Sequence, residues 1–179
     1  MHFRHFSETR LQGTYLVDIE RQEDSRGFFA RSWCRREFEA RGLSVLSAQS
    51  SVSYTKVKGT LRGLHYQAPP AAEVKLVRCT RGAIYDVVVD LRRDSPTYRC
   101  WLGIETKASQ HRMLYVPEGL AHGFQTLEDD VEVTYQMSEF YTPEAERGVR
   151  YNDPAFGIQW PLEVELISEK DLRWPAYVG

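Results

Sequence analysis

The chain has 179 residues, of which 23 are Lys or Arg and 25 are Asp or Glu, so its formal net charge is −2. This length suits one domain with a single core, and 42% apolar with 27% charged residues is typical of a folded globular protein. The nearly balanced charge argues against a basic surface that binds nucleic acid. We therefore expect one domain over residues 1–179 and no nucleic-acid partner.

Signals for membranes, secretion and disulfide bonds are also missing from the sequence. No stretch approaches the roughly 18–20 apolar residues that a membrane span needs, and the first six residues lack the apolar run of a secretory signal. Cys34, Cys79 and Cys100 are odd in number and form no C-x-x-C motif, which argues against a disulfide framework and a zinc ribbon. These features predict a cytoplasmic location and no membrane partner.

The predicted elements are one helix and a series of short strands. The helix is expected over 33–42, with Ser32 as its cap and Gly42 at its end. Before it, residues 3–17 alternate weakly and fit an edge strand. The following apolar runs are separated by turn residues and predict strands over 51–55, 61–67, 74–80, 83–91, 98–105, 112–116, 121–127 and 131–137. So many short strands are typical of an all-β antiparallel sandwich or barrel.

Alternation along two of these strands indicates which side chains face the interior. Over 131–137 the odd positions are apolar and the even ones polar, so Tyr135 is expected to point inward. The run 83–91 is apolar on both sides, which predicts a central strand. Asp86 and Asp90 share one of its apolar faces, and a carboxylate there needs a partner.

Two of the five histidines stand out by their position. His65 and His122 each lie on a predicted strand that follows a turn containing glycine. His2, His5 and His111 lie at the start of the chain or in a polar turn, where solvent exposure is expected. A single buried histidine is more often a hydrogen-bonded core residue than a catalyst, but two in matching contexts favour a functional site.

The spacings Gly-x5-His65 and Pro-x-Gly-x2-His122 are those of the cupin jelly roll, in which such histidines point into the barrel. Metal-binding cupins have a second histidine where this chain has Gln67, and Glu73 falls later than a ligand should. Lys75 would be repelled by a metal ion and offers no ligand while it is protonated. We therefore predict no metal and no cofactor, with a metal-dependent cupin as the weaker alternative.

Several blocks along nearly the whole chain resemble one family, the dTDP-4-dehydrorhamnose 3,5-epimerases. The blocks follow the family order at 24–29, 59–67, 82–90, 94–97, 116–124, 157–161 and 168–171. The resemblance implies a cupin jelly roll with a few short helices, and epimerisation at C3 and/or C5 of a nucleotide-linked 4-keto-6-deoxy-hexose. The reaction implied first is conversion of dTDP-4-dehydro-6-deoxy-glucose to dTDP-4-dehydro-rhamnose, in dTDP-rhamnose biosynthesis.

The same resemblance implies catalytic roles for four residues. His65 would be the general base that removes the proton α to the C4 ketone, and Asp171 would pair with it. Lys75 would stabilise the enolate, and Tyr135 would return the proton from the opposite face. From residues alone, Tyr135 could be a core tyrosine with its hydroxyl bonded to the backbone, which is the default for an isolated inward tyrosine.

Eight further residues are implied to bind the substrate. In the family, His122, Asp86 and Tyr141 would line the sugar pocket, Arg62 and Arg26 would hold the diphosphate, and Phe29, Gln49 and Ser51 fall in regions that contact the nucleotide. Two have simpler readings: Asp86 could pair structurally with Lys75, and Arg26 could anchor the turn at residues 24–25. Arg62 and His65 would face opposite sides of a regular strand, so a bulge or twist at Gly63 is expected.

Three questions stay open from the sequence. Ser51 stands where the family commonly has Asn and Arg31 where many members have Glu, so the nucleotide could be dTDP, CDP or another. A single-site epimerase or a ketoisomerase would use the same residues, and a sugar-binding module would need neither the His65–Asp171 pair nor Tyr135. The resemblance also implies a homodimer whose N-terminal strands join the partner's sheet, which would let Arg26 reach the other subunit's site.

Overall fold

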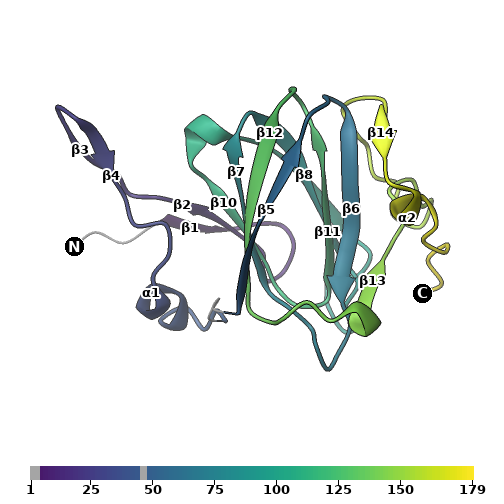
Figure 1. Cartoon of the computed structure of the whole chain (residues 1–179). Helices are drawn as coiled ribbons and strands as arrows, with labels where there is room; N and C mark the ends of the chain where they lie inside the picture. Colours follow the sequence, from purple (N-terminus) through teal and green to yellow (C-terminus); the bar gives the residue numbers. More distant parts are fainter. Residues whose placement is uncertain (1–4, 45–47) are drawn as a thin grey trace.

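The computed structural model describes residues 5–44 and 48–179, and most of its regular structure is β-strand. Two antiparallel sheets face each other, and the expected all-β class is confirmed (Figure 1). The first sheet has the order β1 (His5–Glu8), β2 (Tyr15–Asp18), β10 (Met113–Val116), β7 (Lys75–Arg81), β12 (Val131–Met137), β5 (Gln49–Thr55). The second has the order β13 (Glu146–Gly148), β6 (Thr60–Gln67), β11 (Leu120–Thr126), β8 (Ala83–Asp90), β9 (Trp101–Lys107).

The remaining elements are short. Strand β14 (Leu166–Ile167) pairs in parallel with β6, and β3 (Gln22–Asp24) and β4 (Gly27–Phe29) form a separate hairpin. The helices are α1 (Arg35–Glu39), α2 (Glu169–Leu172) and the 3-10 turns η1 (Ala108–Gln110) and η2 (Pro143–Ala145). Among the described residues, no helix is long and apolar enough to cross a membrane.

The main core lies between the two sheets and explains the alternation in the sequence. Val131 and Val133 of β12 are fully buried there, and Tyr135 packs against the same cluster, as predicted. From the facing sheet, Ile84 and Val88 of β8 complete the core. The eight strands expected from the apolar runs all exist, with ends that differ by up to three residues.

The outer faces of both sheets are covered by the chain ends. Phe38 of α1 is fully buried in a second cluster on β2, β7 and β10, where it contacts Trp33 with ring centroids 6.4 Å apart. The helix is shorter than predicted, because its N-cap is Cys34 and not Ser32, and no side chain caps it. The C-terminal segment covers the second sheet through a third cluster that includes Phe156 and Ile158.

The N-terminal part holds strands that the sequence indicated only weakly. Strand β1 is the edge of its sheet, as expected for 3–17, although the first residues of that range and His2 lie outside the described residues. The β3–β4 hairpin was not predicted, and it projects from the sandwich (Figure 1). His5 is exposed as expected, whereas His111 is partly buried, with Nδ1 2.8 Å from the Arg78 guanidinium.

Strand β6 carries the irregularity that was expected at Gly63. On β11, His122 pairs with His65, but Phe124 pairs with Arg62, so Gly63 and Leu64 of β6 together oppose the single residue Gly123 of β11. The extra residue is a β-bulge, and it brings Arg62 and His65 to the same side of the strand.

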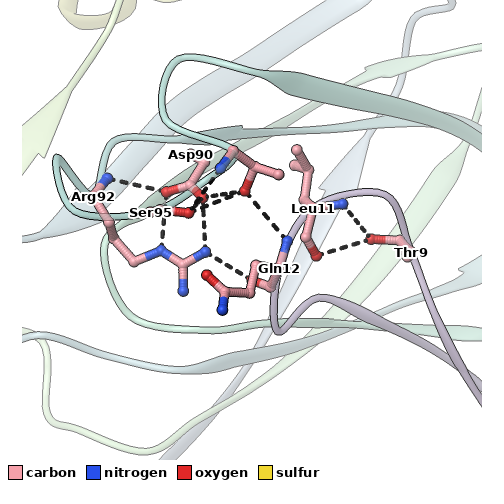
Figure 2. Close-up of polar contacts among 7 residues, drawn as sticks. Thr9, Leu11, Gln12, Asp90, Arg92 and Ser95 are labelled. Atoms are coloured by element: carbon pink, nitrogen blue, oxygen red, sulfur yellow. Dashed lines mark hydrogen bonds and ion pairs between the residues drawn. The ribbon is translucent and has the colours of Figure 1, made fainter.

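Residues 94–97, one of the blocks noted in the sequence, supply hydrogen bonds to Asp90 at the end of β8. Its carboxylate is fully buried and accepts hydrogen bonds from the Arg92 guanidinium and from the hydroxyls of Ser95 and Thr97, at 2.6–2.9 Å (Figure 2). Arg92 also donates to the backbone carbonyl of Gln12 at 2.7 Å, and the Gln12 N–H donates to the Thr97 hydroxyl. A buried carboxylate was expected to need a partner, and Asp90 finds it in this hydrogen-bond network. The network connects the loop after β8 to the N-terminal segment.

Candidate functional site

Two adjoining cavities open between the sheets and share His65 and Tyr135 in their walls. The larger measures about 500 Å³ and is also lined by Arg62, Lys170 and Asp171. The smaller measures about 270 Å³; its walls include Gln49, Ser51, Glu73, Lys75, Tyr141 and Glu146. His65 comes from β6 and Tyr135 from β12, so the two side chains approach the shared space from opposite sheets.

His65 and Asp171 form the pair that the resemblance implies. The His65 Nε2 atom lies 2.5 Å from Asp171 Oδ1, and the other carboxylate oxygen accepts the Gly63 N–H at 3.3 Å. Burial raises the pKa of Asp171, but the hydrogen bond and charge of His65 outweigh it and hold the pKa below its ordinary value. An ionised carboxylate only accepts hydrogen bonds, so the proton sits on His65 Nε2 and leaves Nδ1 as the basic atom.

Tyr135 lies across the shared space from this base. Burial raises the pKa of Tyr135 well above its ordinary value, with the charge of Asp86 adding to the shift. Its hydroxyl has no hydrogen-bond partner within residues 5–44 and 48–179, in contrast to the core tyrosine bonded to backbone that the sequence alone allowed. The phenol therefore keeps its proton at neutral pH and presents it to the cavities.

Lys75 lies beside His65 and carries a positive charge. Its Nζ lies 3.1 Å from Glu73 Oε1 and donates to the backbone carbonyl of His65 at 3.3 Å. The structural pair of Lys75 is thus Glu73, and the predicted alternative pairing with Asp86 is wrong. The Lys75 side chain is 12% exposed and lines the smaller cavity, where its ammonium can meet a developing negative charge.

His122 and Asp86 are placed deeper than expected. The His122 Nε2 atom lies 2.5 Å from Asp86 Oδ1, and the two side chains are 3% and 2% exposed. Neither lines a described cavity; instead the His122 ring contacts the Tyr135 ring edge to face, with centroids 6.0 Å apart. The pair therefore contacts Tyr135 and does not line either of these two cavities.

Of the six remaining predicted binding residues, four line one of the two cavities and two line neither. Arg62 lines the larger cavity and is held by Thr55 Oγ1 at 2.9 Å and the Tyr54 carbonyl at 3.2 Å. Gln49, Ser51 and Tyr141 line the smaller one, where Gln49 Oε1 accepts the Tyr141 N–H. Arg26 and Phe29 line neither cavity.

The β3–β4 hairpin carries those two outlying residues. The Arg26 side chain is 87% exposed and bonds Asp24, so the turn-anchoring interpretation describes its contacts within this chain. Phe29 is 68% exposed. Because the hairpin projects away from the sandwich, the structure does not bring Arg26 or Phe29 to His65 within one chain (Figure 1).

Comparison with known proteins decides the family. The sequence model of the dTDP-4-dehydrorhamnose 3,5-epimerases matches residues 8–178. A dTDP-4-dehydrorhamnose 3,5-epimerase from Shigella flexneri is 44% identical over 172 residues, which cover 96% of this chain and 94% of that protein. The chain belongs to the dTDP-4-dehydrorhamnose 3,5-epimerase family. The resemblance stated from the sequence blocks is thereby confirmed.

Two other relatives bear on the fold and on the number of carbon centres that are epimerised. The crystal structure of the Bacillus anthracis enzyme, with TDP and PPi bound, matches with a TM-score of 0.93 and 40% identity, over 98% of this chain and 100% of that one. The expected cupin-type fold is confirmed. A Streptomyces niveus relative, 39% identical over 90% of this chain and 78% of its own length, is a dTDP-4-dehydrorhamnose 3-epimerase.

Some residues of this epimerase site were missed by the sequence analysis. Ser53, Glu146 and Lys170 line the cavities. Lys170 falls in the recognised 168–171 block, so that block was its signal, whereas nothing in the sequence distinguished Glu146. In the described part of the chain, no group of three or more His, Cys, Asp and Glu side chains is placed to hold a metal ion.

Proposed function

We propose that this chain epimerises a dTDP-linked 4-keto-6-deoxy-hexose at C3 and C5, converting dTDP-4-dehydro-6-deoxy-glucose to dTDP-4-dehydro-rhamnose. The observation that carries the proposal is the placement of His65 and Tyr135 on opposite sheets around one shared space. A base on one side and an acid on the other is the arrangement that inverts a carbon centre.

The first step is proton removal by His65. The C4 ketone acidifies the flanking C–H bonds, and Nδ1 takes the proton while the C–H electron pair forms an enolate. Asp171, 2.5 Å from Nε2, stabilises the imidazolium that results. The Lys75 ammonium stabilises the enolate oxygen as its charge develops.

The second step is proton return by Tyr135. Its phenol donates to the carbon from the opposite face, which inverts the configuration, and the enolate electron pair forms the new C–H bond. The phenolate and the imidazolium then exchange protons with water. Water can reach the His65 side chain, because 32% of it is exposed. Repetition at the second carbon gives the 3,5-epimer.

Binding of the nucleotide is assigned to the surroundings of these groups. Arg62 in the larger cavity would bond the diphosphate, because a guanidinium donates two parallel hydrogen bonds to phosphate oxygens. Gln49, Ser51 and Tyr141 would contact the sugar or nucleotide in the smaller cavity. The His122–Asp86 pair would support Tyr135 from behind.

We further propose that the enzyme is a homodimer in which the β3–β4 hairpin completes the partner's site. Arg26 and Phe29 are exposed on this hairpin and remote from His65 of their own chain, as the fold shows. A two-fold dimer would place each hairpin at the other subunit and add Arg26 to the diphosphate ligands there.

Hydrogen exchange in deuterated water tests the reaction. The enzyme is incubated with dTDP-4-keto-6-deoxyglucose, and the C3 and C5 protons are followed by NMR. Loss of both signals with formation of the 3,5-epimer is expected. Absence of any exchange would contradict the proposal, and exchange at C3 alone would make the chain a 3-epimerase like its Streptomyces niveus relative.

Two controls sharpen this experiment. The His65→Asn variant should lose exchange, by about 10²–10⁴-fold in rate, while it still binds the nucleotide sugar. A parallel incubation with the CDP-linked sugar compares the nucleotides, since Ser51 and Arg31 depart from the common pattern of the family. Faster turnover of the CDP-linked sugar would move the substrate assignment away from dTDP.

A further inference from the structure

We propose that four residues outside the catalytic set form a latch that positions Asp171 against His65. The latch consists of Glu146 and Gly148 of β13 together with Lys170 and Trp174, and we infer that these are positioning residues for proton removal. This inference rests on the proposed role of His65 as the base.

Helix α2, which carries Asp171, has little of its own to hold it in place. It contains four residues, and isolated helices so short are unstable. Asp171 is its single buried residue, whereas Leu172 is 46% exposed, so no apolar face of the helix packs into the core. The Ser168 hydroxyl accepts the Asp171 N–H at 3.1 Å and caps the helix, but this bond lies within the same segment. Contacts from outside α2 must therefore fix it.

The first outside contact is the ion pair of Lys170 with Glu146. The Lys170 Nζ atom lies 2.5 Å from Glu146 Oε1, and Glu146 Oε2 accepts the Tyr141 hydroxyl at 2.8 Å. Exposed ion pairs contribute little, but Glu146 is 16% exposed and is held by both partners. Because β13 pairs directly with β6, with Gly148 opposite His65, the ion pair ties α2 to the strand beside the base.

The second outside contact is the packing of Trp174 on Gly148. A Cβ atom added to Gly148 would lie 2.2 Å from the Trp174 ring, so the ring rests directly on the backbone of β13. The same ring contacts His65 edge to face, with centroids 6.1 Å apart. Trp174 follows α2 by two residues, so the helix is held on its C-terminal side as well.

These two contacts have a consequence for catalysis. A hydrogen bond of 2.5 Å between Asp171 and His65 tolerates little displacement of α2, and it decides which ring nitrogen carries the proton. Displacement of a reacting group by about 1 Å can lower a rate by about 10²-fold. The latch thus keeps Nδ1 unprotonated and aimed into the shared cavity space.

The test compares two carboxylate-to-amide variants. Glu146→Gln removes the ion pair with Lys170, whereas the control Glu169→Gln removes the exposed pair with Arg173 on the same helix. For Glu146→Gln, we expect kcat to fall about tenfold with little change in KM, and the ¹⁵N resonances of the His65 ring to show a mixture of tautomers. Glu169→Gln should keep the wild-type kcat and the single Nε2–H tautomer.

A second variant addresses the Trp174 contact. Gly148→Ala forces the ring away and should lower kcat and mix the tautomers in the same way, with circular dichroism confirming the fold. If Glu146→Gln and Gly148→Ala both keep the wild-type kcat and the Nε2–H tautomer, the latch is wrong while the role of His65 stands. If His65→Asn keeps full exchange, the proposed base is wrong, whatever the latch variants do.

Discussion

Gly63 of β6 lies against Gly123 of β11 so closely that neither position can hold a side chain. A Cβ atom on Gly63 would lie 2.5 Å from the Gly123 Cα, and a Cβ on Gly123 would lie 2.5 Å from the Arg62 carbonyl oxygen. Gly63 also has φ +117°, which residues with a side chain rarely adopt. This contact is where the bulge brings Arg62 and His65 to one side, so the site depends on two glycines that do no chemistry.

Gly63→Ala is therefore expected to damage both stability and catalysis. The clash and the positive φ together should lower the free energy of unfolding by at least about 2 kcal/mol, measured in urea. Gly157→Ala is the matched control, because Gly157 also has a positive φ of +63° but has nothing within 4 Å of an added Cβ. That control should lose about 1 kcal/mol and keep its kcat. Equal losses in the two variants would show that the close approach of β6 and β11 does not matter.

The bulge also shows how much of the site could be predicted. The alternation of 131–137 predicted that Tyr135 faces inward, because burial enforces a period of two. The two glycine–histidine spacings, which are those of the cupin jelly roll, predicted the same for His65 and His122. Strict alternation failed at Arg62 and His65, and that failure correctly indicated an irregular strand at Gly63. The sequence likewise predicted that Asp90 needs a partner, because it is a carboxylate on an apolar face of its strand.

Other features could not be predicted because they depend on contacts between distant segments. Glu146 has no distinctive neighbours in the sequence, and only the pairing of β13 with β6 brings it to the site. The β3–β4 hairpin packs little apolar surface, so it leaves no alternating pattern to read. Strand periodicity predicts which side of a sheet a side chain faces but not how deeply it is buried. The burial of His122 and Asp86 beside Tyr135 therefore could not be predicted.

Tyr135→Phe should separate proton removal from proton return. The variant keeps the ring contact with His122 but loses the donor hydroxyl, so deuterium should still enter the substrate while formation of the epimer falls by about 10²–10⁴-fold. NMR of the sugar protons, with configuration read from coupling constants, measures both. Wild-type yields of the epimer would remove Tyr135 as the donor.

The raised pKa of Tyr135 gives this acid a defined pH dependence. A phenol donates only while it is protonated, and burial raises the pKa of Tyr135 above the ordinary value of about 10. Its protonated fraction, and the step that depends on it, should therefore stay constant from neutral pH to beyond about pH 10. A fall in the rate of inversion near pH 8 or 9 that is absent from the exchange reaction would contradict this, as pH–rate profiles of the two processes would show.

Asp90 should make stability depend on acid pH. Burial raises the pKa of Asp90, but hydrogen bonds from Arg92, Ser95 and Thr97 lower it to about 2 in the folded chain (Figure 2). Because the folded pKa lies below the unfolded value of about 3.9, the stabilisation is fully present above about pH 4 and is lost as the pH falls towards 2. The contribution is about 2–3 kcal/mol, and Asp90→Asn should remove at least about 2 kcal/mol at pH 7.

Urea unfolding at several pH values measures this effect. Asp90→Asn should also flatten the fall in stability between about pH 4 and 2, because the group that titrates there is gone. Glu105→Gln is the control, since Glu105 pairs with Lys107 at the surface and is 54% exposed. A decline in acid of the same steepness in Asp90→Asn and in the wild type would show that other carboxylates dominate.

The projecting hairpin makes the dimer testable by mixing inactive subunits. If Arg26 serves the partner's site, a site needs His65 from one chain and Arg26 from the other. Arg26→Ala and His65→Asn homodimers should each be impaired, but every heterodimer would contain one site with both residues intact. After random exchange of subunits, about a quarter of all sites should be restored, measured as the rate of deuterium exchange. If Arg26 acted within its own chain, no site would regain both residues and mixing would restore nothing. Light scattering supplies the independent check, because a monomer in solution would exclude any shared site.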